Sequence, residues 1–165
     1  MKTLYLIRHA KSSWDHPGLS DFDRPLNDRG KRDAPMMGKR LKERAIHPSL
    51  MLSSPAKRAL STCKRIAEVI GYPSVNIKTN RDLYHADEEQ LLAIVRALPD
   101  KYETVMIFGH NPGLTEFVNS MNRDQVIPNI PTSGVVAFRY DVDRWNHVDF
   151  GRGEFMFFDF PKKEK

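Results

Sequence analysis

Leu4-Tyr5-Leu6-Ile7-Arg8-His9-Ala10 is the stretch of sequence that decides the fold. Its four consecutive apolar residues are typical of a strand that is buried on both faces of a parallel sheet. The apolar run ends abruptly at an arginine and a histidine, and Val105-Met106-Ile107-Phe108 likewise runs into Gly109-His110. Ligands bind at the carboxyl ends of strands in open α/β sheets, so the two histidines mark the expected functional edge.

Strand-like runs alternate with helical patterns along the rest of the chain. We expect strands at 4–7, 49–53, 75–79 and 104–108, weaker strands at 135–140 and 147–150, and helices at about 27–45, 55–70, 87–98 and 111–121. Helix signals include an N-cap at Asn27, a first-turn proline at Pro55 and a capping box at Asp87 and Gln90. Pro35 predicts a kink or a later start in the first helix. This alternation predicts a three-layer α/β/α fold with a mostly parallel central sheet.

The whole chain, residues 1–165, has the length of one domain, with a basic tail at about 161–165. The single cysteine, Cys63, excludes an internal disulfide and any cysteine-built metal site. The short apolar run near the N-terminus is neither a signal-peptide core nor a membrane span, so we expect a cytoplasmic protein without a membrane partner. A net charge of +5 suits an anionic substrate. Nucleic-acid binding is not predicted, because the sequence has no stretch in which basic and aromatic residues alternate.

A third polar feature follows the predicted strand at 49–53. The segment Ser53-Ser54-Pro55-Ala56-Lys57-Arg58 places Arg58 in the first turn of the next helix, where backbone N–H groups attract anions. A guanidinium group is permanently charged, and its planar fork fits phosphate oxygens. If the strands before His9 and His110 are neighbours, both histidines, Arg8 and Arg58 converge on one phosphate site. A histidine packed in the core and a solvated basic helix face are the structural alternatives for these positions.

Three segments together resemble the histidine phosphatase superfamily, which has a phosphoglycerate mutase-like fold. They are Arg8-His9-Ala10, Ser53 to Ala59, and Gly109-His110-Asn111-Pro112-Gly113, and the resemblance spans about residues 1–122. The Arg-His-Ala variant, followed by Asp21-Phe22-Asp23-Arg24-Pro25-Leu26, is similar to the small SixA-related branch of phosphohistidine phosphatases. The resemblance implies that His9 is the nucleophile and that Arg8, Arg58 and His110 hold the phosphoryl oxygens, with no metal or other cofactor. A carbonyl is expected to fix the His9 tautomer, and a protonated His110 is expected to be the better donor.

The sequence departs from larger superfamily members in two places. Those members carry an acid that protonates the leaving oxygen, and the stretch Leu83 to Glu88 offers no certain match, although Asp87 and Glu88 are candidates. Imidazole leaves more readily than an alkoxide, so a site without an acid favours a phosphohistidine substrate, in a protein or peptide. Asp15 stands where relatives carry an asparagine, and we do not expect it to bind phosphate. The oligomeric state and the pathway stay open.

Three other functions compete with this hypothesis. A phosphatase of small phosphomonoesters would use the same nucleophile with Asp87 or Glu88 as the acid. Metal-dependent hydrolysis would use His9, His85, His110 and a carboxylate as ligands, but the chain lacks the usual ligand spacings and the arginines would repel a cation. A phosphate-binding module without turnover is the third alternative. His85 is more readily interpreted as a surface residue, or as one that supports the site from behind, than as a catalytic residue. Asp23 and Arg24 are interpreted as residues that order a loop over the site.

Overall fold

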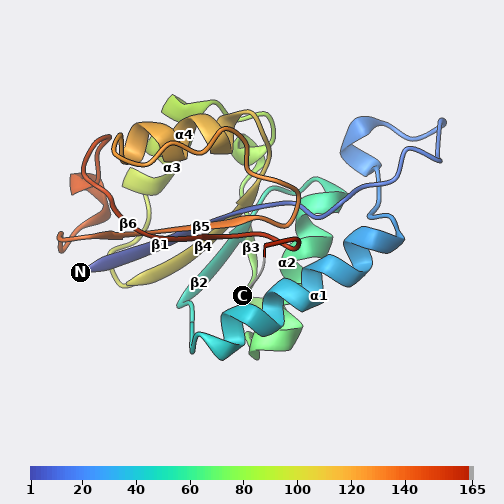
Figure 1. Ribbon diagram of the computed structural model, residues 1–165, viewed down its shortest axis with the longest axis horizontal. Helices are drawn as coiled ribbons and strands as arrows, with labels where there is room; N and C mark the ends of the chain where they lie inside the picture. Colours follow the sequence, from blue (N-terminus) through green and yellow to red (C-terminus); the bar gives the residue numbers. More distant parts are fainter. Residues whose placement is uncertain (164–165) are drawn as a thin grey trace.

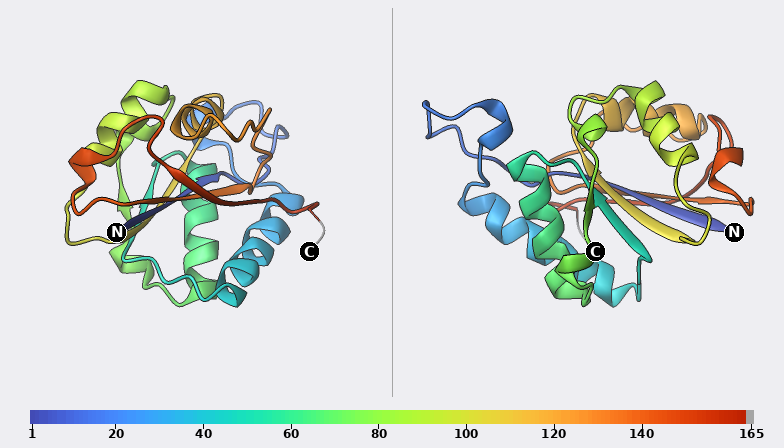
Figure 2. Two further views of the ribbon diagram at one scale, coloured as in Figure 1. Left: turned by 60° about the vertical axis from the view of Figure 1, so that its left-hand side comes forward. Right: turned by 180° about the vertical axis from the view of Figure 1, so that it is seen from behind.

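The computed structural model describes residues 1–163, which form a six-stranded sheet between two layers of helices (Figure 1). The strand order is β3-β2-β4-β1-β5-β6, with β3, β2, β4 and β1 parallel and with β5 and β6 antiparallel to their neighbours. The strands are β1 (Lys2–Arg8), β2 (Leu50–Ser53), β3 (Lys78–Thr79), β4 (Thr104–Gly109), β5 (Val135–Tyr140) and β6 (Glu154–Asp159). Helices α1 (Asp28–Glu43) and α2 (Lys57–Ile70) cover one face, and α3 (Glu88–Arg96) and α4 (Gly113–Met121) cover the other (Figures 1 and 2). The predicted fold class is confirmed.

Strand β1 lies in the middle of the sheet and is buried on both faces. Leu4 and Leu6 belong to the hydrophobic cluster under α3 and α4, whereas Tyr5 and Ile7 belong to the cluster under α1 and α2. Side chains alternate between faces along a strand, so a central strand covered on both sides needs apolar residues at every position. This requirement explains the unbroken apolar run.

The predicted caps of α1 and α3 are present, but the start positions predicted from Pro35 and Pro55 were wrong. The Asn27 side chain accepts a hydrogen bond from the Gly30 N–H, and α1 begins directly after this cap and continues through Pro35, so the later start was wrong. The capping box of Asp87 and Gln90 is present at α3. Helix α2 begins at Lys57 rather than at Pro55, because Ala56 still has extended backbone angles.

The strand predictions were wrong at the sheet edges. Strand β3 is only two residues long, because residues 74–76 form a 3-10 turn in which Val75 is exposed. The candidate strand at 147–150 does not form: His147 ends the 3-10 segment Trp145–His147, and residues 148–150 continue as irregular chain leading into a turn. The aromatic segment at 155–160, which none of the predicted strands includes, is mostly strand β6, which pairs with β5. Edge strands have one neighbour at most, so their patterns are weaker than those of central strands.

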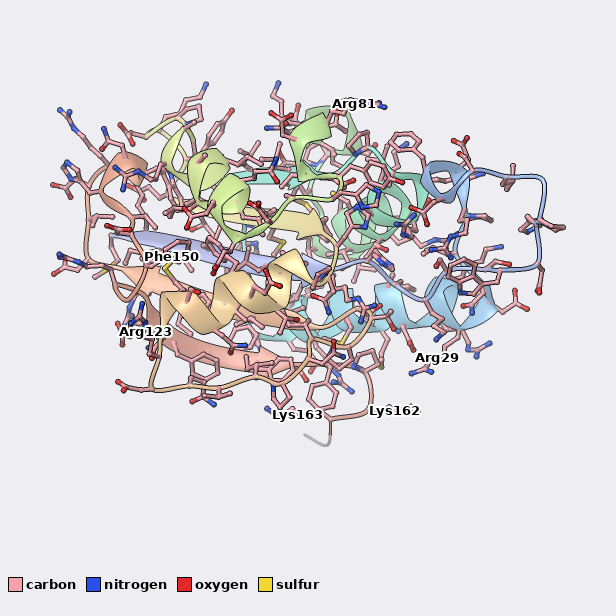
Figure 3. The ribbon with its side chains drawn as sticks, turned by 90° about the horizontal axis from the view of Figure 1, so that it is seen from above. Arg29, Arg81, Arg123, Phe150, Lys162 and Lys163 are labelled. Carbon is pink, nitrogen blue, oxygen red and sulfur yellow. The ribbon has the colours of Figure 1, made fainter. Side chains whose placement is uncertain are left out.

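The described part of the tail is in contact with the body of the protein. Lys162 and Lys163 lie at the periphery (Figure 3), and the Lys163 ammonium donates to the Phe158 carbonyl. Lys165, part of the predicted frayed end, lies outside the described residues. Within residues 1–163, no helix is both long enough and apolar enough to cross a membrane.

Candidate active site

The two predicted histidines lie next to each other at the carboxyl ends of β1 and β4. These strands are parallel neighbours with Arg8 opposite Gly109, so the next residue of each strand is a histidine. The His9 N–H donates to the Gly109 carbonyl, and the two imidazole rings have centroids 5.3 Å apart. Both side chains are buried, each with 7% exposure. The strand adjacency that the sequence could only assume therefore holds.

Arg58 reaches the same site from the first turn of α2. Its side chain is buried. Thr62 of the same helix connects α2 to the loop after β1, because its hydroxyl accepts from the Ala10 N–H and donates to the Arg58 carbonyl. The same loop also packs closely against the first turn of α1, since a Cβ on Gly30 would lie 2.2 Å from the Lys11 carbonyl oxygen. These contacts fix the start of α2 against the end of β1.

Unpaired donors gather among the predicted site residues. In the described part of the chain, five buried side-chain atoms lack a hydrogen-bond partner, and they include Arg8 Nε, Arg58 Nε and His110 Nδ1. Arg8 is anchored by a hydrogen bond from Nη1 to the Ile130 carbonyl, 2.9 Å away. Buried donors normally have partners, so three orphan N–H groups on neighbouring residues indicate a site for an oxyanion.

The tautomer of His9 follows from its backbone contact. Its Nδ1 lies 2.7 Å from the Ala10 carbonyl oxygen, which can only accept, so Nδ1 carries the proton and Nε2 keeps a free lone pair. Burial is the largest influence on the ring and, with the charges of Arg58 and Arg8, lowers the pKa of His9 to about 4. His9 is therefore neutral at physiological pH and can attack an electrophile through Nε2.

His110 is held by Ser54, a residue to which sequence reasoning gave no separate role. The His110 Nε2 lies 2.8 Å from the Ser54 hydroxyl, which also accepts the Ala56 N–H. Burial, followed by the neighbouring His9, lowers the pKa of His110 to about 3. The neutral tautomer in which Nε2 accepts from Ser54 carries its proton on Nδ1, the ring nitrogen that has no partner among the described residues. His110 thus supplies a donor without being protonated, and a bound dianion would raise its pKa.

Asp21 is the site residue that sequence reasoning missed. Its backbone and carboxylate oxygens accept from Arg58, and the carboxylate also accepts from the Tyr84 hydroxyl at 2.6 Å and from Arg24 Nε at 3.2 Å. Arg24 in turn donates to Ser12 and lies over the Trp14 ring. The loop-ordering role expected for Arg24 matches these contacts. No local pattern relates Asp21 to Arg58, because 37 residues separate them.

Of the remaining candidates, His85 lines the cavity that holds the predicted site residues, whereas Asp15, Asp87 and Glu88 do not. Asp15 is exposed, and its backbone N–H donates to the Ser13 hydroxyl. Asp87 caps α3 and Glu88 contacts the Ser120 hydroxyl, so both acids have structural partners. His85 is exposed and has a left-handed backbone with φ 61°, and its ring centroid lies 3.9 Å from that of Tyr84.

A cavity of about 310 Å³ joins the site residues. It is lined by Arg8, His9, Lys11, Ser12, Trp14, Asp21, Arg24, Arg58, His85, His110, Asn111 and Thr132. A larger apolar hollow of about 600 Å³ lies between α3 and the β2–β3 edge and contains none of the predicted site residues. Among residues 1–163, no group of three or more histidine, cysteine or acidic side chains is arranged to hold a metal ion. The smaller, cationic cavity is the candidate active site.

The lowered histidine pKa values predict a specific loss of stability in mild acid. Between about pH 6.5 and pH 4, unfolded histidines bind protons that folded His9 and His110 do not, so the free energy of unfolding falls as the pH falls. His9 alone should contribute on the order of 3 kcal/mol across this window. Urea unfolding at pH 7, 5.5 and 4.5 measures the effect.

The matched controls for this prediction separate these two histidines from the others. The combined variant His9→Asn/His110→Asn should have a much flatter pH dependence, while His147→Asn, at an exposed position, should follow the wild type. Equal slopes for the wild type and the combined variant would contradict the assignment of buried, neutral imidazoles.

A buried, neutral histidine beside two arginines and a second histidine, at the carboxyl edge of an α/β sheet, is the arrangement expected of a phosphoryl-binding class of site. The family model for the histidine phosphatase superfamily (branch 1) matches residues 4–112. The chain therefore belongs to the histidine phosphatase superfamily, whose phosphatases use a histidine nucleophile.

Similar proteins agree with this placement. An uncharacterised chloroplastic protein of Arabidopsis thaliana is 34% identical over 73% of this chain, which spans 59% of that protein's length. The protein histidine phosphatase SixA complexed with tungstate has a TM-score of 0.82 and 23% identity, with 96% of this chain and 97% of that chain covered. The putative phosphohistidine phosphatase SixA from Agrobacterium tumefaciens has a TM-score of 0.77 and 28% identity, with 97% and 98% covered.

Proposed function

We propose that the protein is a phosphatase that forms a phosphohistidine intermediate on His9 and dephosphorylates phosphohistidine in a protein or peptide. The observation that carries the proposal is the free Nε2 of neutral His9 within a buried ring of unpaired donors. Arg8, Arg58 and His110 are the proposed ligands of the phosphoryl oxygens. The similarity to SixA structures supports the same substrate class.

The reaction consists of two displacements at phosphorus. In the first, the Nε2 lone pair of His9 forms a bond to phosphorus while the bond from phosphorus to the substrate imidazole breaks, and the departing imidazole keeps that electron pair and takes up a proton. In the second, water attacks phosphorus, loses a proton, and releases phosphate as the bond to Nε2 breaks. The guanidinium groups and the Nδ1–H of His110 stabilise the oxygens during both transfers.

The shortage of carboxyl groups in the cavity lining supports a substrate with a good leaving group. Of the described residues that line the cavity, only Asp21 has a carboxyl group. A hydrogen bond from Tyr84, with further ones from Arg58 and Arg24, holds the pKa of Asp21 well below its usual range. A carboxylate that stays ionised cannot protonate a leaving alkoxide, whereas a departing imidazole has little need of such an acid.

We expect kcat/KM for a phosphohistidine peptide to exceed that for a simple alkyl phosphate by about 100-fold or more, since general-acid catalysis contributes roughly 10²–10⁴-fold where it is required. Phosphate release from the two substrates, measured side by side with the same protein, tests this preference. Faster cleavage of the alkyl phosphate would contradict the proposed substrate class.

The small-phosphomonoester alternative is weakened, because Asp87 and Glu88 do not line the cavity. Phosphate release that continues in the presence of a chelator would rule out metal-dependent hydrolysis. Turnover of any substrate would rule out a module that only binds phosphate. A cytoplasmic location and the lack of nucleic-acid and membrane partners remain predictions, which cell fractionation and binding assays can test.

A further inference from the structure

The 3-10 segment η1 (Asp21–Asp23) lies against α2 and brings one carboxylate to Arg58. The Asp21 carbonyl accepts from Arg58 Nη1 at 2.7 Å, and Asp21 Oδ2 accepts from Arg58 Nη2 at 3.0 Å. The two oxygens of one residue therefore occupy the end of the guanidinium group formed by its two terminal nitrogens. The Arg58 side chain is 6% exposed and that of Asp21 is 44% exposed.

This contact determines which edge of the guanidinium group faces the phosphoryl site. A guanidinium group has five N–H donors, and Asp21 uses one on each terminal nitrogen. Arg58 Nε is buried and unpaired, so the lateral edge formed by Nε and Nη2 stays available for a bidentate contact with an oxyanion. A guanidinium group free to rotate would lose entropy on binding, whereas this one is already oriented.

Other contacts hold the loop itself. Arg24 donates to the Ser12 hydroxyl and the Ser13 carbonyl, and the Ser13 N–H donates to the Pro25 carbonyl. Asp23, on the same 3-10 turn as Asp21, accepts from the Ser20 hydroxyl, whereas Asp21 accepts from Arg58. Loop order thus has supports besides the Asp21 carboxylate, whose contact with Arg58 can be altered separately.

We propose that Asp21 is a positioning residue, which fixes the terminal nitrogens of Arg58 so that the Nε–Nη2 edge is presented to the phosphoryl group. This inference rests on the proposed function for its kinetic consequences. It assigns Asp21 no contact with the reacting atoms. Its proposed effect on the phosphoryl group passes through Arg58, while Tyr84 and Arg24 also donate hydrogen bonds to its carboxylate.

The test uses Asp21→Asn, with Asp23→Asn as the matched control on the same turn. Asp21→Asn should lower kcat/KM for a phosphohistidine peptide by about tenfold, on the scale of a weakened charged hydrogen bond. It should also weaken the binding of orthovanadate, a phosphoryl mimic, by a similar factor in calorimetry. Asp23→Asn should stay within about twofold of wild type in both measurements, and both variants should keep the wild-type melting temperature within a few degrees.

A double-mutant cycle separates positioning from a general effect on the site. In an Arg58→Ala background, Asp21→Asn should change orthovanadate affinity by less than about twofold, because the residue through which it acts is gone. An equal loss in both backgrounds, or wild-type orthovanadate affinity in Asp21→Asn, would overturn the proposal. If the wild type binds orthovanadate but turns over no phosphohistidine peptide, the proposed function fails while the orthovanadate cycle still decides the role of Asp21.

Discussion

Replacement of His9 by asparagine is expected to lower kcat by roughly 10⁴-fold or more, the scale seen when a catalytic nucleophile is removed. Asparagine keeps a similar size and polarity but offers no imidazole lone pair, so the covalent route is closed. The arginines and His110 would remain and could still bind the substrate. Steady-state phosphate release from a phosphohistidine peptide measures the loss, with KM expected to change far less than kcat.

The control for this prediction is His147→Asn, which changes the same side chain at an exposed position outside the cavity. It should retain wild-type kcat. If His9→Asn also retains most of its activity while remaining folded, His9 is not the nucleophile, and a direct attack by water or another histidine must be considered.

Replacement of Arg58 by alanine is expected to lower kcat/KM by about 10²–10³-fold, as does the loss of one donor from a preorganised oxyanion site. Arg58 lies at the start of α2, and the change removes a guanidinium group whose buried Nε has no partner among residues 1–163. The Asp21 carboxylate would also be left beside the substrate without one of its cations.

Lys57→Ala is the matched control, because Lys57 is the adjacent residue on the same helix turn and is exposed. Loss of this charge should change kcat/KM only through the weak general field of the protein, by a few-fold at most, and the change should shrink with added salt. Equal losses for Lys57→Ala and Arg58→Ala would show that net charge, rather than the oriented guanidinium group, promotes the reaction.

Central elements of this fold could be predicted from sequence because their requirements are local. Strand β1 is apolar at every position since both of its faces are covered, and Asn27, Asp87 and Gly71 mark helix ends through their own side chains or backbone angles. Strand β6 escaped prediction because its residues are only partly buried and pair with β5 alone. Its aromatic pattern reflects packing, which several backbone conformations can satisfy.

In the candidate site, too, some residues could be predicted from local sequence and others could not. His9 and His110 were found because each directly follows an apolar strand, and Arg58 because it follows a strand and starts a helix. Asp21 and Tyr84 contact Arg58 and each other from segments distant in the chain, so only the folded structure relates them. The donor tautomer of His110 likewise depends on Ser54, 56 residues away.

The central claim, that His9 Nε2 receives the phosphoryl group, is tested most directly by locating the phosphoryl group in a trapped intermediate. The protein is mixed with a phosphohistidine peptide, quenched in base within milliseconds, and analysed by mass spectrometry and phosphorus NMR. The account predicts one phosphoryl group on His9, linked through Nε2, stable in base and lost in acid. A phosphoryl group on another residue, or none during active turnover, would contradict it.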